Sequence, residues 1–179
     1  MAKTMKLAAL LSVIATVCFS VIYIYNGVSV FLSLAITFGT IAFHLCLRLL
    51  VGGLYNLIVK NNADYTKKWY QVKAWEKKLY KKIKVKKWKN KLPTYDTDAF
   101  DASKHSWDEI VMASCQSELV HETNVVFSFV PIVFSIWFGS LAVFIITSVC
   151  GALFDLVFVI IQRYNRPRLL KMASKSNKR

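Results

Sequence analysis

A carboxylate and an imidazole stand three residues apart in the sequence, at Glu118 and His121. Residues at this spacing share one face of a helix, so the two side chains could meet. A carboxylate beside an imidazole orients the ring and raises its basicity, which suits a general base at neutral pH. We therefore predict His121 as a base that Glu118 orients. A purely structural pair at a membrane boundary is the alternative, because a single E-x-x-H motif is a weak signal and di-iron bundles need a second one.

A second candidate site follows the last apolar run, in the segment R-Y-N-R-P-R. Arg163, Arg166 and Arg168 fall within six residues, and each guanidinium offers a planar fork that matches phosphate or carboxylate oxygens. We expect Pro167 to end the helix here and to fix how the arginines are presented. Together with Asn165, the arginines are predicted to bind an anion or a lipid headgroup. The alternative is a basic stop signal after a membrane span, which lysines would serve equally well.

Three polar residues interrupt apolar runs, where charges are costly and are functional suspects by default. His44 and Arg48 are four residues apart and share a helix face, and Asp155 lies eight residues before Arg163. Asp155 is then roughly 12 Å inside the membrane, at 1.5 Å per residue. A contact between Arg48 and Asp155 is predicted. Alternatively, Arg48 extends its side chain to the membrane surface.

The elements that must position these residues follow from how apolar and charged residues are segregated. The chain has 179 residues, of which 55% are hydrophobic, and a formal net charge of +14. A bilayer span needs roughly 20 apolar residues, and the remaining aqueous parts are too short for a separate soluble catalytic domain. The sequence therefore predicts an all-α integral membrane protein, a single domain over residues 1–179 with two hairpins that turn at Asn26-Gly27 and Gly139-Ser140. The four predicted spans are about 7–25, 28–50, 120–138 and 141–161, with a kink or break at Gly52-Gly53 and a kink at Pro131.

Positive charges predict the orientation of these spans. The N-terminus carries two lysines, residues 60–124 carry 14 lysines and the tail 163–179 carries seven lysines and arginines, whereas both hairpin turns carry none. The positive-inside rule then places both termini and the basic loop 60–119 on the cytoplasmic side of the cell membrane.

The basic belt, residues 60–92, holds 13 lysines with interleaved tryptophans and tyrosines, and only Asp64 and Glu76 as acids. Contact with anionic lipid headgroups is favoured over nucleic-acid binding, because a loop between two spans is already held at the lipid surface. A third interpretation is a loop that only determines topology. Whether the belt forms one helix or two is open, and so is the oligomeric state. After it, Ser106 and Glu109 are spaced as in a capping box and predict the start of a helix.

Three blocks together resemble the glycosyl-4,4'-diaponeurosporenoate acyltransferase family of Gram-positive bacteria: YKKIKVKKWKNKLP at 80–93, SELVH at 117–121 and IIQRYNRPRLL at 160–170. The resemblance implies transfer of a fatty acyl group to a sugar hydroxyl of a membrane carotenoid glycoside. Carried over to this sequence, it implies a site formed by Glu118, His121, Arg163, Asn165, Arg166 and Arg168.

No serine or cysteine nucleophile is evident, so we expect direct transfer without an acyl-enzyme. An acyl thioester is the expected donor, and neither a cofactor nor a metal site is predicted, because the cysteines form no C-x-x-C pair. The rival hypothesis is a non-catalytic membrane protein that binds or moves an anionic lipid or a lipid-linked intermediate. Another lipid-modifying reaction is disfavoured by the absence of a glycine-rich nucleotide loop.

Overall fold

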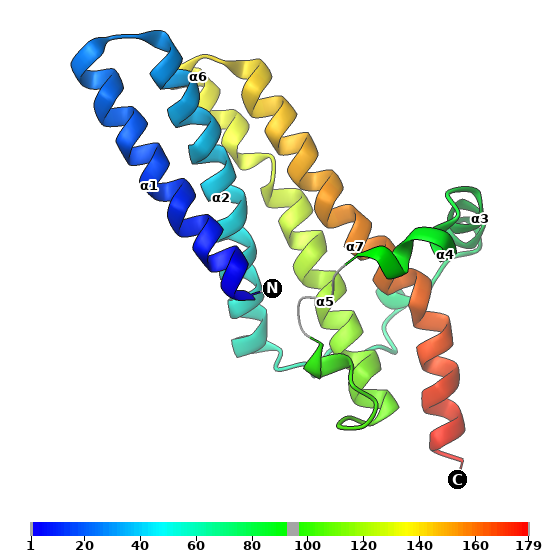
Figure 1. Ribbon diagram of the computed structural model, residues 1–179. Helices are drawn as coiled ribbons and strands as arrows, with labels where there is room; N and C mark the ends of the chain where they lie inside the picture. Colours follow the sequence, from blue (N-terminus) through cyan, green and yellow to red (C-terminus); the bar gives the residue numbers. More distant parts are fainter. Residues whose placement is uncertain (1, 93–96, 179) are drawn as a thin grey trace. The chain divides into compact units, whose positions relative to one another are not determined.

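Every regular element in the described part of the chain is a helix. The computed structural model describes residues 2–92 and 97–178, and no strand occurs within them (Figure 1). With η marking 3-10 helices, the elements are α1 (Ala2–Asn26), α2 (Ser29–Ile58), η1 (Lys68–Tyr70), α3 (Ala74–Lys82), α4 (Val85–Trp88), η2 (Lys89–Lys91), η3 (Asp98–Phe100), α5 (Trp107–Phe127), η4 (Val130–Phe134), α6 (Ser135–Phe138) and α7 (Leu141–Ser176).

Within the described residues, four stretches of helix are long and apolar enough to cross a membrane: Lys3–Asn26, Ser29–Ile58, Trp107–Phe138 and Leu141–Ser176. This confirms the predicted fold class. The helices extend past the predicted spans, because a helix need not end where the bilayer ends. The predicted boundary between loop and third span, near residue 120, accordingly lies inside α5.

The chain folds as two compact units. Unit 1 consists of Met1–Gly52 and Thr123–Phe154, and unit 2 consists of Gly53–Glu122 and Asp155–Arg179. Helices α2, α5 and α7 each contribute to both units. Whether the two units act as the single membrane domain predicted from the sequence stays a prediction.

Unit 1 begins with an antiparallel helical hairpin. Between α1 and α2, Gly27 has φ +68°, a left-handed conformation that glycine adopts without steric cost, and its N–H donates to the carbonyl of Tyr23 at 2.8 Å. Phe19 of α1 stacks on Phe31 and Phe38 of α2, with ring centroids 6.4 and 5.5 Å apart. The second hairpin turns at Gly139, with φ +66°.

Unit 1 also contains an apolar cavity of about 330 Å³. Its walls come from α1, α2, η4, α6 and α7, and include Gly39, Phe43 and Pro131. The predicted kink at Pro131 is confirmed, since α5 ends at Phe127 and the chain continues as a 3-10 helix. Of the predicted kink or break at Gly52-Gly53, the break is wrong, because α2 runs through both residues, and the kink stays a prediction. A glycine costs a helix only about 1 kcal/mol relative to alanine, so it weakens a long apolar helix without ending it.

The prediction that Pro167 ends its helix is also wrong. Pro167 lies inside α7, which continues to Ser176. Proline removes one backbone hydrogen bond and costs about 3 kcal/mol in a helix interior. The turns after it offset this cost through packing, because Ala173, Leu169 and Leu170 pack into the buried apolar cluster of unit 2. Tertiary contacts thus override the local signal.

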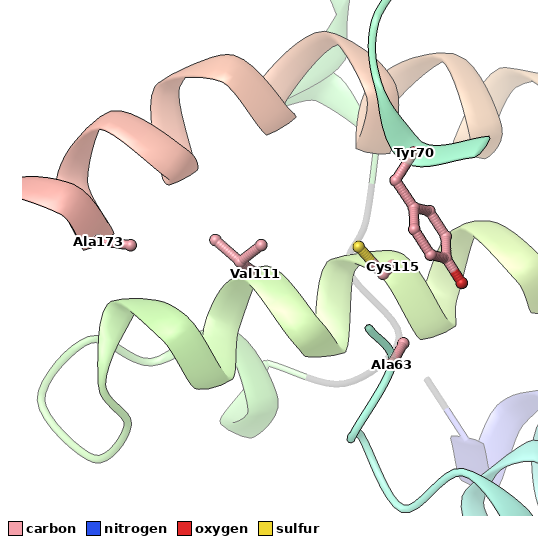
Figure 2. Packing of buried hydrophobic residues seen from close by; sticks show 5 residues of the cluster. All are labelled: Ala63, Tyr70, Val111, Cys115 and Ala173. Atoms are coloured by element: carbon pink, nitrogen blue, oxygen red, sulfur yellow. The ribbon is translucent and has the colours of Figure 1, made fainter. Parts of the chain in front are cut away.

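That cluster gathers around the first half of α5. Its buried members are Ala63, Tyr70, Val111, Cys115 and Ala173 (Figure 2). The start of α5 is the predicted capping box: the Ser106 N–H donates to Glu109 Oε2 at 2.7 Å, and the Glu109 N–H donates to Ser106 Oγ at 3.3 Å. Helix α5, whose start is fixed by the capping box, therefore packs against residues from distant parts of the chain.

The described part of the basic belt is neither one helix nor two long ones. It consists of the short elements η1, α3, α4 and η2. Lys84 separates α3 from α4 in a left-handed conformation, with φ 52°. Because the chain changes direction between these short elements, individual side chains of the belt can contact α5 and α7 within unit 2.

Candidate functional site

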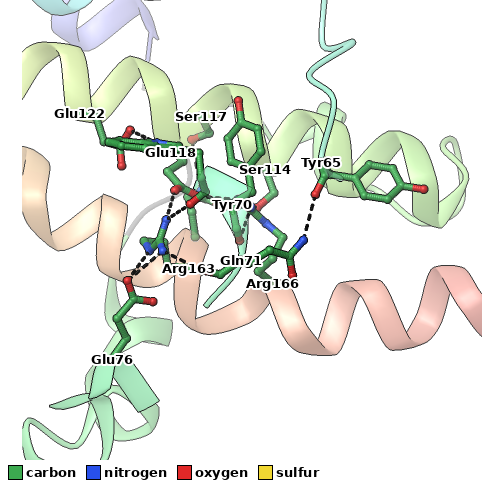
Figure 3. Close-up of polar contacts among 12 residues, drawn as sticks. Tyr65, Tyr70, Gln71, Glu76, Ser114, Ser117, Glu118, Glu122, Arg163 and Arg166 are labelled. Carbon is green, nitrogen blue, oxygen red and sulfur yellow. Dashed lines mark hydrogen bonds and ion pairs between the residues drawn. The ribbon is translucent and has the colours of Figure 1, made fainter. Parts of the chain in front are cut away.

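Four charged side chains are buried together in unit 2. Glu118 of α5 accepts hydrogen bonds from Arg163 Nη1 at 2.5 Å and from Arg166 Nη2 at 2.6 Å. Oε1 of Glu76, from α3, accepts from Arg163 Nε at 3.2 Å and Nη2 at 2.8 Å. Figure 3 shows Arg163 between the two carboxylates. Two acids and two bases sum to zero charge, so the cluster neutralises itself in a buried place where an unpaired ion would be costly.

The same two arginines bind three consecutive backbone carbonyls of the belt. Arg163 donates to the carbonyls of Trp69 at 3.0 Å and Gln71 at 3.3 Å. Arg166 donates to the carbonyl of Tyr70 at 3.5 Å and lies 5.3 Å from the centre of its ring. These hydrogen bonds therefore hold the backbone of residues 69–71 of the belt against α7.

The three arginines that were predicted to bind an anion differ in burial and in hydrogen-bond partners. Arg163 and Arg166 direct their forks at groups of the protein itself, while Arg168 is exposed. That the first two bind an external anion stays a prediction. Sequence reasoning missed Glu76 as a partner, although it is one of only two acids among the 13 lysines of the belt. A lone acid in a basic run is a usable signal for a buried ion pair.

His121 forms a dyad with Asp155. His121 Nδ1 lies 2.8 Å from Asp155 Oδ1, and the imidazole stacks on Phe158 with ring centroids 4.8 Å apart and planes at 14°. Asp155 is fully buried, whereas the His121 side chain is 20% exposed. Within the described residues, Nε2 of His121 has no hydrogen-bond partner. The ring is thus oriented through one nitrogen, and part of the side chain is exposed.

The carboxylate that orients His121 therefore differs from the predicted one. The sequence spacing pointed to Glu118, but the carboxylate of Glu118 is taken by two guanidiniums. Asp155 of α7 occupies the orienting position instead. Both residues of the dyad were predicted as candidates separately. Their link was missed because a contact between two helices leaves no trace in the spacing within either one.

The outward side of the arginine motif meets a lysine of the belt. Lys89 Nζ donates to Asn165 Oδ1 at 2.6 Å and lies 5.2 Å from the centre of the Tyr164 ring. Burial, followed by the charge of Arg168, lowers the pKa of Lys89 below its usual value. No sequence feature distinguishes Lys89 from the other lysines of the belt.

The remaining predicted residues, His44 and Arg48, lie in unit 1. Arg48 donates to the carbonyl of His44 at 3.0 Å and to that of Gly151 at 3.2 Å, and its guanidinium lies 4.9 Å from the centre of the Phe154 ring. The His44 ring packs so closely on Gly151 that a Cβ there would lie 2.8 Å from His44 Cε1. The predicted contact between Arg48 and Asp155 would join the two units and stays a prediction.

The described residues thus define a class: a helical protein with four potential membrane spans and a histidine–aspartate dyad beside a neutral buried ion cluster. They include no group of three or more His, Cys, Asp or Glu side chains that could hold a metal ion. Comparison with protein families then makes the assignment specific. The chain belongs to the glycosyl-4,4'-diaponeurosporenoate acyltransferase family, whose sequence model matches residues 66–175. Comparisons with curated proteins and with solved structures give no match.

Proposed function

We propose that the protein transfers a fatty acyl group from a thioester donor to a hydroxyl of a membrane glycolipid, with His121 as the general base. The dyad carries this proposal. Nδ1–H of His121 donates to Asp155, which leaves Nε2 as an acceptor on a side chain that is partly exposed. A base must come within about 3 Å of the proton that it takes, and the partial exposure of the ring supports such an approach to Nε2.

In the proposed reaction, His121 Nε2 removes the proton of the acceptor hydroxyl while the hydroxyl oxygen attacks the thioester carbonyl. The new C–O ester bond forms, the C–S bond breaks, and the departing thiolate takes the proton back from the imidazolium. No acyl-enzyme, oxidant or further reactant is needed. The buried carboxylate of Asp155 stabilises the transient imidazolium and holds the ring in the required tautomer.

The family's name supports acyl transfer as the reaction class, and it names a carotenoid glycoside as the acceptor. The distribution of lysines and arginines supports a cell-membrane protein with both termini and the belt on the cytoplasmic side. The reaction is therefore proposed at the cytoplasmic interface, where a water-soluble thioester donor and a lipid acceptor can meet. Glu118, which touches Arg163 and Arg166, is assigned a positioning role instead of a catalytic one.

The test compares His121→Ala and Asp155→Asn with His105→Ala, which replaces a histidine outside the dyad. Glycolipids of a strain lacking the gene, complemented with each variant, are profiled by mass spectrometry. His121→Ala should lower the acylated product by roughly 10²–10⁴-fold, the usual contribution of a general base. Asp155→Asn should also lower it, whereas His105→Ala should leave it unchanged. Unaltered acylated glycolipids in the His121→Ala strain, with loss on deletion, would overturn the proposal in favour of a lipid-binding protein that needs no base.

A further inference from the structure

Two cations, Lys89 and Arg168, converge on one turn of α7. Lys89 is anchored there through its 2.6 Å hydrogen bond to Asn165 and its contact with the Tyr164 ring. Arg168 follows Asn165 by three residues, so both lie on the same face of the helix, which continues through Pro167. Lys89 approaches that face from η2, a part of the chain 76 positions away from Asn165.

The two acids of the buried cluster are engaged by other cations. Glu118 and Glu76 pair with Arg163 and Arg166. Among the described residues, neither Lys89 nor Arg168 has an ion pair with a carboxylate. Besides burial, the charge of Arg168 lowers the pKa of Lys89, as expected when two cations lie near each other.

We propose that Lys89, Asn165 and Arg168 form a binding site for a single phosphate group. Their donors complement a phosphate: the Lys89 ammonium, the planar fork of Arg168, and the amide Nδ2 of Asn165, whose Oδ1 is already used by Lys89. A bound phosphate would neutralise the convergent charges. Arg163 and Arg166 of the same motif do not contribute, because their forks are engaged by Glu118, Glu76 and belt carbonyls.

A phosphate reaches this surface from one of two sources, a lipid headgroup or a phosphorylated thiol carrier that brings the acyl chain. The site goes beyond the proposed acyl transfer and does not depend on it, since no atom of the dyad takes part. His121→Ala should accordingly retain phosphate binding. Failure of the base assignment and failure of the phosphate site are therefore separate results.

The experiment uses the full chain in phosphatidylcholine nanodiscs, with two probes. One arm adds phosphatidylglycerol and counts retained lipid by native mass spectrometry, and the other titrates coenzyme A by equilibrium dialysis. Lys89→Gln and Arg168→Gln are compared with Lys87→Gln and Lys171→Gln, which remove the same charge from exposed neighbours. Because charge-assisted hydrogen bonds contribute about 1.5–3 kcal/mol, each site variant should weaken binding roughly tenfold or more, and each control less than about twofold.

The affected probe identifies the source: loss with phosphatidylglycerol alone indicates a lipid headgroup, and loss with coenzyme A alone indicates the donor. Lys89→Arg keeps the charge and should retain binding, which separates loss of the ligand contact from misfolding. Equal weakening by all four glutamine variants would overturn the proposal, because it indicates diffuse attraction by a basic surface. Unchanged binding of both probes in Lys89→Gln and Arg168→Gln would overturn it as well.

Discussion

Replacing Glu118 by glutamine removes the one carboxylate that both buried arginines share. Arg163 keeps Glu76 as a counter-ion, but Arg166 has no other carboxylate within reach among the described residues. Arg166 is 1% exposed, so its charge cannot be solvated instead. Truncating one partner of a buried ion pair costs about 3–5 kcal/mol, because the other charge stays buried and uncompensated.

That cost is large against a typical folding free energy of about 5–15 kcal/mol. Since each 1.4 kcal/mol is a factor of ten, Glu118→Gln should raise the unfolded-to-folded ratio by roughly two to four powers of ten. The assay is equilibrium unfolding of the purified chain in mixed micelles, followed by tryptophan fluorescence. Arg166→Met alone should also destabilise, since it leaves Glu118 with one guanidinium instead of two. The double variant should recover most of the loss, because a buried pair replaced by neutral groups is often close to neutral.

A Glu118→Gln protein within about 1 kcal/mol of the parent would refute this reasoning, since the pair would then have solvent or a partner that the geometry does not show. Measuring turnover as well separates a catalytic role of Glu118 from a structural one. If Glu118 took part in the chemistry, the glutamine variant would lose activity while its unfolding curve stayed unchanged. We expect instead that the Glu118→Gln variant loses activity only in proportion to its loss of folded protein.

Three further changes test other parts of the fold. Gly151→Ala should destabilise by about 1–3 kcal/mol, because its Cβ would lie 2.8 Å from the His44 ring; Gly52→Ala, which meets nothing within 4 Å, is the control and should gain up to about 1 kcal/mol. Pro167→Ala should raise the unfolding midpoint by restoring a helix hydrogen bond, and a lower midpoint would show that the proline is needed for packing. Burial raises the pKa of Tyr70 to about 12. The folded state then holds this proton more tightly, so stability is intact below about pH 10 and is lost between about 10 and 12; Tyr70→Phe should lessen that loss in unfolding curves measured across this range.

Much of the fold could be predicted because its signals are local. Apolar runs of span length, turns at Gly27 and Gly139, and the capping box at Ser106 each depend on residues close together in the chain. The two wrong predictions, a break at Gly52-Gly53 and a helix end at Pro167, also used local signals. They failed because a helix tolerates a local cost of about 1–3 kcal/mol when its neighbours pack well.

The sequence could predict which residues form the candidate site, but not which of them contact each other. His121, Asp155 and Glu118 were all candidates from residue type and position alone. Which carboxylate meets the imidazole depends on competition for Glu118, and the guanidinium partners lie 45 and 48 positions further along the chain. Spacing within one helix carries no information on that competition. Lys89 is a harder case, because its distinction from other lysines exists only in the folded chain.

The arginine motif shows how one short segment can serve two purposes on one helix. Arg163 and Arg166 are three residues apart and point inward to carboxylates, whereas Asn165 and Arg168 are three residues apart on another face. This division exists only because α7 continues through Pro167; if the helix ended there, Arg168 would leave the face of Asn165. Substitutions at the inward pair should therefore lower stability, and substitutions at the outward pair should lower phosphate binding while the protein stays folded. A motif that carries a family resemblance can thus be required for folding at some positions and for ligand binding at others, so resemblance alone does not make every matched residue part of the reaction site.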